Sequence, residues 1–219
     1  MATHLYILSE GEDDEMFYER LAEQATGRSF AYGDEYRVRP GANWKSVLAT
    51  SKLLICRFKH WADRQDIAVI IAVDNDRAPQ HPGGRAYPRP LPALDKTKAP
   101  RYPAMQQMLI EELGPDASKW PVDVALAVPV EMIESWVLKL LKPDREDLPL
   151  FAQASQKTAR DYYGKQPPPQ LKDLRDEEAR VRNLTRAELF WQAAEQPLEP
   201  AIQASRSLAM FVEQLKSWR

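Results

Sequence analysis

The sequence has one cysteine and three histidines among 219 residues. A single cysteine cannot form an internal disulfide, and so few cysteine and histidine ligands speak against a structural zinc site. Cys56 lies in the apolar run 53–56, so we expect a buried thiol. His81 stands alone in a polar segment, where a solvated side chain is expected rather than a catalytic one.

Long apolar runs are also missing. None approaches the ~20 residues that a membrane-spanning helix needs, and residues 1–14 do not have the pattern of a signal peptide. We therefore expect a cytoplasmic protein with no membrane partner. The net charge is only −2, so overall charge argues neither for nor against a nucleic-acid partner. Hydrophobic residues make up 44% of the chain, enough for a sizeable core.

Apolar periodicity predicts alternating strands and helices over the first 142 residues. The predicted strands are 4–8, 34–39, 66–73 and 122–128, and the predicted helices are 12–25, 43–63, 104–113 and 130–142. Such alternation predicts an α/β fold with a mainly parallel sheet and helices on both faces. Residues 143–219 are predicted to form a helical C-terminal extension, broken at the prolines 167–169 and near Pro197 and Pro200.

Residues 77–103 contain seven prolines and are predicted to form a long loop. Six basic residues oppose one acid over residues 77–102, a local charge of +5: Arg77, Arg85, Arg89, Lys96, Lys98 and Arg101. These cations are candidates for binding a phosphate backbone, and Tyr87 and Tyr102 are candidates for stacking on bases. The alternative is a solvated loop that its prolines keep extended.

Acidic residues follow two of the predicted strands. Glu10 ends the first strand and Asp14 comes one turn later, while Asp74 and Asp76 end the strand 66–73. Because functional groups of parallel sheets gather at the carboxyl ends of strands, these carboxylates are expected to converge. Oxygen ligands without His or Cys favour Mg²⁺ or Mn²⁺. The alternative is that these acids cap helices and turns, which is the interpretation we favour for Glu12, Asp13 and Glu15.

The combination resembles the Toprim domain of topoisomerases, bacterial primases and the overcoming-lysogenization-defect (OLD) nucleases. In that domain one strand ends in Glu-Gly and a later one in Asp-x-Asp, as Glu10-Gly11 and Asp74-Asn75-Asp76 do here. The spacing from Glu10 to Asp14 and Phe17 is similar to the OLD-like branch.

A second segment narrows the resemblance. Residues 129–136, with Ile133-Glu134-Ser135-Trp136, are similar to a Pro-x-x-x-Ile-Glu-x-Trp segment of small bacterial Toprim proteins found beside ATPases in defence-type loci. Residues 156–157 and 163–165, and the segment with Ser207 and Phe211, also resemble the C-terminal part of that group. Two departures are Ser9, where an apolar residue is usual, and the long basic insertion after Asp76.

The resemblance implies roles for the matching positions. The implied metal ligands are Glu10, Asp14, Asp74, Asp76 and Glu134. Glu10 would also act as general acid or base, and Lys157 or Lys165 would stabilise charge on the phosphate. Glu134 is alternatively an orienting residue or an acid on the helix surface. Trp136 is expected in the core rather than as a stacking platform.

Two functions follow from these expectations. The first is a nuclease that uses Mg²⁺ or Mn²⁺ to cleave DNA or RNA, as the effector of an anti-phage defence system with an ATPase partner. The second is a non-catalytic Toprim-like module that docks on an ATPase or binds a nucleotide. A primase-like activity has only the shared domain in its favour, and the oligomeric state is open.

Overall fold

Strands and helices alternate along the described part of the chain. The computed structural model describes residues 3–11, 14–32, 43–61, 67–75, 78, 98–129, 133–141, 143, 187–188 and 190–219, without the side chains of Trp61, Glu134 and Leu138. The elements in chain order are β1 (His4–Leu8), α1 (Asp14–Thr26), β2 (Ala31–Tyr32), α2 (Trp44–Trp61), β3 (Ile67–Ala72), α3 (Arg101–Leu113), the 3-10 helix η1 (Ala117–Lys119), β4 (Asp123–Ala127), α4 (Glu134–Leu141), α7 (Leu198–Ala204) and α8 (Arg206–Lys216).

The four strands form one sheet in which every pair is parallel, in the order β2-β1-β3-β4. The register places Leu8 of β1 beside Ile71 of β3, and Ala72 of β3 beside Ala127 of β4. All six residues of β3 are buried, as expected for a central strand of a parallel sheet. The predicted parallel α/β sheet is therefore confirmed, with β1 and β3 at its centre.

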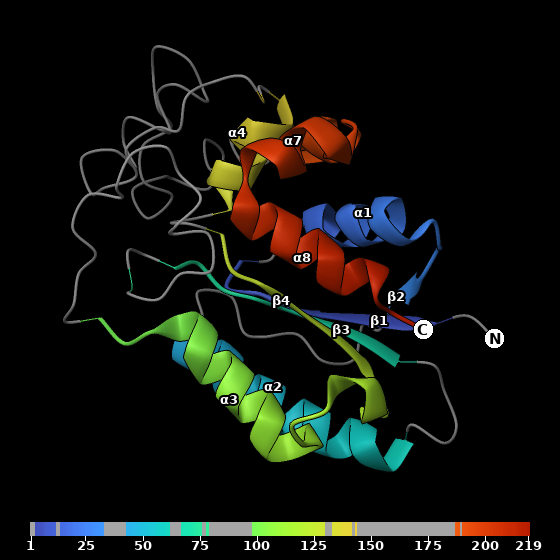
Figure 1. The fold of residues 1–219 in the computed structure, drawn as a ribbon, viewed down its shortest axis with the longest axis vertical. Helices are drawn as coiled ribbons and strands as arrows, with labels where there is room; N and C mark the ends of the chain where they lie inside the picture. The colour runs from blue at the N-terminus through green and yellow to red at the C-terminus, as the bar shows by residue number, and fades with distance from the viewer. Residues whose placement is uncertain are drawn as a thin grey trace, which may run out of the picture.

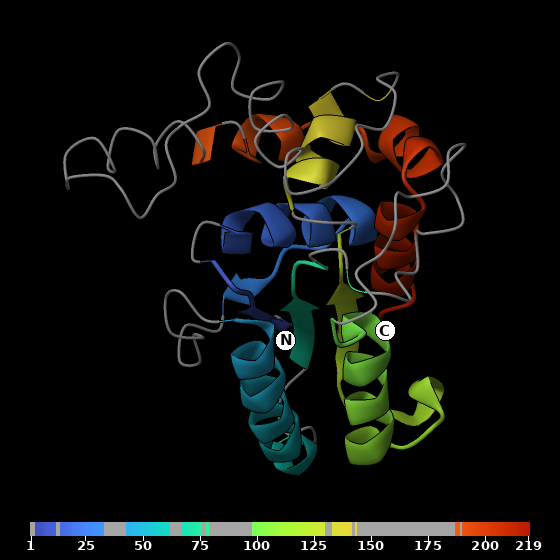
Figure 2. The ribbon, with the colours of Figure 1, turned by 90° about the vertical axis from the view of Figure 1, so that its left-hand side faces the viewer.

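Helices cover both faces of this sheet, which is also as predicted. Leu5 and Ile7 of β1 belong to the core beneath α1, α4 and α8, whereas Tyr6 and Leu8 belong to the core beneath α2 and α3. This alternation is the period of two of a strand. Figures 1 and 2 show α2 and α3 side by side on one face, α1 and α8 on the other, and α4 and α7 stacked outside α1.

The C-terminal helices belong to the same core as the first half of the chain. Phe211 of α8 lies 6.0 Å from Tyr18 of α1 between ring centroids, and Phe190 lies 5.4 Å from Phe17. All four side chains are buried in one cluster with the strand residues. The described part of the predicted extension 143–219 thus forms a layer of the α/β core.

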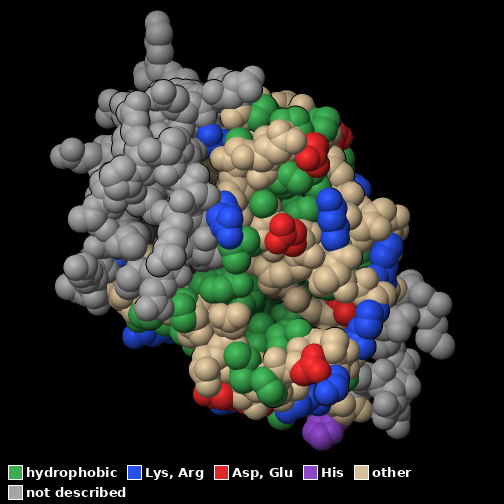
Figure 3. All heavy atoms as spheres, in the orientation of Figure 1, with side chains coloured by type: hydrophobic (Ala, Val, Ile, Leu, Met, Phe, Trp, Pro, Cys, Tyr) green, Lys and Arg blue, Asp and Glu red, His purple; other side chains and the backbone are tan. Residues whose placement is uncertain are grey.

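Helix α8 also covers the edge of β4 that pairs with no other strand of the described residues. The side-chain amide of Gln214 accepts from the Leu126 N–H at 3.0 Å and donates to the Leu126 carbonyl at 3.3 Å. One side chain thereby replaces the backbone pairing that a further strand would give, which shields an exposed edge from other chains. Hydrophobic side chains gather between α8 and α3 on this face (Figure 3).

Three predictions are corrected by the structure. Helix α3 begins at Arg101, so residues 101–103 are helical and do not belong to the predicted loop 77–103. Pro200 lies within α7 and does not break it. Both Pro103 and Pro200 are the third residue of their helix, where the N–H has no intrahelical partner, so its absence is tolerated.

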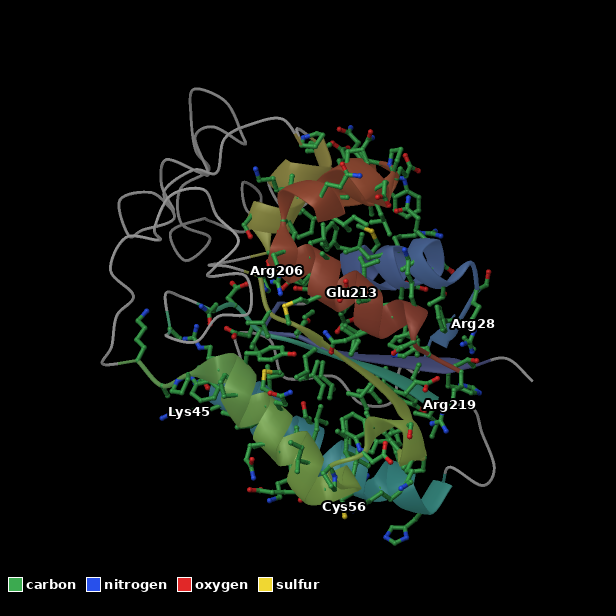
Figure 4. All side chains as sticks on the ribbon, viewed as in Figure 1. Arg28, Lys45, Cys56, Arg206, Glu213 and Arg219 are labelled. Atoms are coloured by element: carbon green, nitrogen blue, oxygen red, sulfur yellow. The ribbon has the colours of Figure 1, made fainter. Side chains whose placement is uncertain are left out.

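Cys56 is the third correction, because its side chain is exposed and points away from the sheet (Figure 4). Four consecutive apolar residues cannot all lie on one face of a helix with 3.6 residues per turn. In α2 the buried face holds Leu54 and Ile55, while Leu53 is 68% exposed. The amphipathic character predicted for this helix is otherwise confirmed.

Several predictions fall outside the described residues: the strand 34–39, most of the loop 77–103 and the breaks at prolines 167–169. Within the described ranges, no helix has the length and apolar character needed to cross a membrane.

Candidate metal site at the carboxyl ends of β1 and β3

The order of the strands reverses between β1 and β3. From β1 the chain crosses to β2 on one side, and it later returns to β3 on the other side. In open parallel sheets, ligands bind in the crevice outside the carboxyl ends of the strands at such a switch point. Glu10 stands two residues after β1 and Asp74 stands two residues after β3. These two carboxylates therefore flank the switch point, at the left end of the sheet in Figure 1.

The turn from β1 into α1 is closed by short local bonds. The Ser9 hydroxyl donates to the Gly11 carbonyl at 2.6 Å, and the Asp14 N–H donates to the same carbonyl at 3.3 Å. Asp14 and Glu15 occupy the first turn of α1 and are each 9% exposed. Carboxylates are favoured there because the N-terminus of a helix carries partial positive charge. The Oε1 atom of Glu10 is buried in the same region.

Gly11 allows the Asp14 carboxylate to lie directly against the backbone of this turn. A Cβ atom at position 11 would meet Oδ2 of Asp14 at 2.9 Å and its Cγ at 3.2 Å. Contacts as short as 2.9 Å between a Cβ atom and another heavy atom essentially never occur in proteins. The glycine of the Glu-Gly pair is thus explained by packing against an acid three residues later.

The variant Gly11→Ala is expected to displace the Asp14 carboxylate and to weaken Mn²⁺ binding by about 10-fold, the lower end of what misplaced metal ligands cost. The Mn²⁺ affinity is measured by titration, in which the decrease of the electron paramagnetic resonance signal of free Mn²⁺ reports binding. The turn itself should survive, because both of its hydrogen bonds involve backbone groups or Ser9.

Gly27 offers the matched control. It follows α1 with φ +67°, and a Cβ atom at this position would meet no other atom within 4 Å, so alanine there is strained but does not clash. We expect Gly27→Ala to cost about 1 kcal/mol of stability and to leave Mn²⁺ affinity unchanged. Equal affinities of the Gly11→Ala variant and the wild type would contradict the role given to Asp14.

Asp74 is held by two elements far from it in sequence. Its Oδ1 atom accepts from the Ile133 N–H at 3.0 Å, directly before α4. Its backbone carbonyl accepts from Nη1 of Arg101, the first residue of α3, at 2.5 Å. The Asp74 strand end and the Ile133-Glu134-Ser135-Trp136 segment therefore meet in space. The sequence does not reveal the two donors, because a backbone N–H has no side-chain signature and the proline-rich pattern places Arg101 in a loop.

Asn75, directly after Asp74, is joined to Ala78 by two hydrogen bonds. The Ala78 N–H donates to the Asn75 carbonyl at 2.7 Å, and Nδ2 of Asn75 donates to the Ala78 carbonyl at 3.0 Å. Asn75 is 1% exposed. Its buried side chain thus ties the residue that follows Asp74 to Ala78.

The remaining predicted site residues lie partly inside and partly outside the described part of the chain. Lys98 is partly exposed just before α3, whereas Arg101 is buried. Tyr102 lies in α3 packed against the core, where burial raises the pKa of its phenol. Glu134 is the first residue of α4, and its side chain is not described. The predicted residues outside the described part are Asp76, Arg77, Arg85, Tyr87, Arg89, Lys96, Lys157 and Lys165.

The described residues do not form a complete metal site by themselves. Within them, no group of three or more Asp, Glu, His or Cys side chains is arranged to hold an ion. Glu10, Asp14 and Asp74 supply carboxylate oxygens, the type of ligand that Mg²⁺ and Mn²⁺ prefer. A complete site requires Asp76, the Glu134 side chain or a rearrangement of the three described acids.

Comparison with known proteins adds nothing to this geometry: no protein-family model, curated protein or solved structure matches the chain.

Proposed function

We propose that this chain is a nuclease that uses Mg²⁺ or Mn²⁺ to cleave phosphodiester bonds in DNA or RNA, on a Toprim-like fold. One observation carries the proposal: acids follow both central strands at the switch point of a parallel sheet, Glu10 after β1 and Asp74 after β3. Helix capping alone would also place acids after parallel strands, so the proposal depends on acids following both central strands at the switch point.

The proposed metal ligands are Glu10, Asp14, Asp74, Asp76 and Glu134. When bound, the ion polarises a phosphoryl oxygen and lowers the pKa of an attacking water. Asp14 is packed against Gly11, and Oδ1 of Asp74 is bound by the Ile133 N–H. Ligands with restrained side chains lose less freedom when an ion binds.

The chain's own residues would carry the proton transfers and the substrate contacts. Glu10 is proposed to take the proton of the attacking water, and Lys157 or Lys165 to stabilise the charge of the phosphate. Lys98 and the loop cations Arg77, Arg85, Arg89 and Lys96 are proposed to hold the nucleic-acid backbone. An ATPase partner in an anti-phage defence system is proposed from the resemblance alone.

The test is incubation of the purified chain with plasmid DNA and with structured RNA, in Mg²⁺, in Mn²⁺ and in EDTA. The proposal expects cleavage that needs the ion and stops with EDTA. Mn²⁺ titration is run in parallel. Binding of Mn²⁺ without cleavage of either substrate, alone or with an ATPase partner, would favour the non-catalytic module; absence of binding would refute the metal site.

A further inference from the structure

The guanidinium of Arg101 is buried at the site although no predicted role requires it there. Arg101 is the first residue of α3 and only 7% exposed. Burying a charge is costly unless it is bonded. Its Nη1 donates to the Asp74 carbonyl at 2.5 Å, and the guanidinium carbon lies 5.6 Å from the ring centroid of Trp44. Arg101 is therefore fixed between the end of β3 and the start of α2.

This contact acts on the peptide group that leads out of Asp74. The Asp74 carbonyl belongs to the same peptide plane as the N–H of Asn75, and Asn75 is itself bonded to Ala78. The direction of the Asp74 side chain depends on that backbone. With the Ile133 N–H on Oδ1, Asp74 is restrained at its backbone by Arg101 and at its carboxylate by the residue that precedes α4.

We propose that Arg101 is a positioning residue, which orients Asp74 for metal binding and does not itself contact the nucleic acid. The inference rests on the proposed function, since it concerns a ligand of the proposed ion. A guanidinium has two opposite effects on a nearby cation site. Its positive charge repels the ion, whereas its hydrogen bond orders a ligand. Because the guanidinium donates to the backbone that carries the Asp74 ligand, we expect the ordering to dominate.

The experiment compares the wild type with Arg101→Met and Arg101→Lys. Methionine is unbranched and apolar like the stem of arginine, but it is shorter and removes the charge and the donors. We expect Arg101→Met to weaken Mn²⁺ binding about 10- to 100-fold, as the loss of a residue that orients a metal ligand does. Arg101→Lys should restore most of the affinity, because an ammonium group can donate to one carbonyl. Tighter or unchanged binding by Arg101→Met would overturn the proposal.

A second readout needs no metal. In the metal-free protein, Arg101→Met should speed amide hydrogen exchange in the peptide that contains Asp74, Asn75 and Ala78, and unchanged exchange would overturn the inference. If the wild type binds no Mn²⁺, the proposed function fails while the exchange experiment still tests the positioning. If Arg101→Met does not fold, Trp44→Leu takes its place. It removes the other support of the guanidinium, and faster exchange with severalfold weaker Mn²⁺ binding is expected.

Discussion

Replacing Glu10 by glutamine and Asp74 by asparagine is expected to abolish the metal-dependent cleavage of nucleic acid that we propose. Each change removes one negative charge and keeps the size of the side chain. A metal ion contributes several kcal/mol to the transition state, and about 4 kcal/mol corresponds to about 10³-fold in rate. We therefore expect each single variant to lose about 10³-fold or more in the single-turnover rate on plasmid DNA or RNA.

The fold should survive these two substitutions. Asparagine at position 74 keeps an Oδ1 atom that can accept from the Ile133 N–H, and its backbone carbonyl still accepts from Arg101. Glu213→Gln is the matched control, because this exposed acid on α8 lies away from the strand ends (Figure 4) and loses the same charge. Full activity in the Glu10→Gln and Asp74→Asn double variant would assign the cleavage to another site.

Local pattern was enough to predict the elements that place these acids. The apolar runs 4–8 and 66–73 correspond to β1 and β3 almost residue for residue. Glu10 and Asp74 follow these strands. Because all strands of a parallel sheet end at the same edge, both acids lie at that edge. Local pattern does not reveal which strands are neighbours. The order β2-β1-β3-β4, which puts Glu10 and Asp74 on either side of the switch point, depends on packing across the whole chain.

The groups that hold Asp74 could not be predicted for a related reason. Arg101 lies 27 residues from Asp74 and the Ile133 amide lies 59 residues away. A periodic pattern reports which face a side chain occupies but not which distant donor it meets. The basic composition of residues 77–102 suggested an exposed role for Arg101, whereas its surroundings bury it. A single charged residue carries no local signal that separates these two environments.

The segment with Ile133 and Trp136 joins the site to the core. The Trp136 N–H donates at 2.9 Å to the carbonyl of Ile133, the same residue whose amide holds Asp74. The indole of Trp136 is fully buried, stacks on Phe211 with centroids 5.3 Å apart, and donates from Nε1 to the Ser207 hydroxyl at 2.9 Å. The expected core position of Trp136 is confirmed. Its direct neighbours are Ser207 and Phe211 of α8.

Trp136→Ala is expected to lower the free energy of unfolding by about 3–5 kcal/mol, because it leaves a large cavity between α1, α4 and α8. A domain has about 5–15 kcal/mol of stability in total, so this single change removes a large share of it. Urea denaturation followed by circular dichroism measures the loss. In the folded fraction we also expect weaker Mn²⁺ binding, since the amide of Ile133, directly before α4, loses the packing that holds α4 in place.

Two further variants separate packing from hydrogen bonding. Ser207→Ala keeps the indole but leaves its buried Nε1 without this acceptor, which should cost about 1–3 kcal/mol. Trp191→Ala is the control of equal size change: Trp191 is 40% exposed and lies under the Arg20 guanidinium at 4.5 Å. Its loss should cost about 1 kcal/mol or less. If Trp136→Ala were no more destabilising than Trp191→Ala, the helices over this face would not depend on Trp136, and its link to the Asp74 site would be wrong.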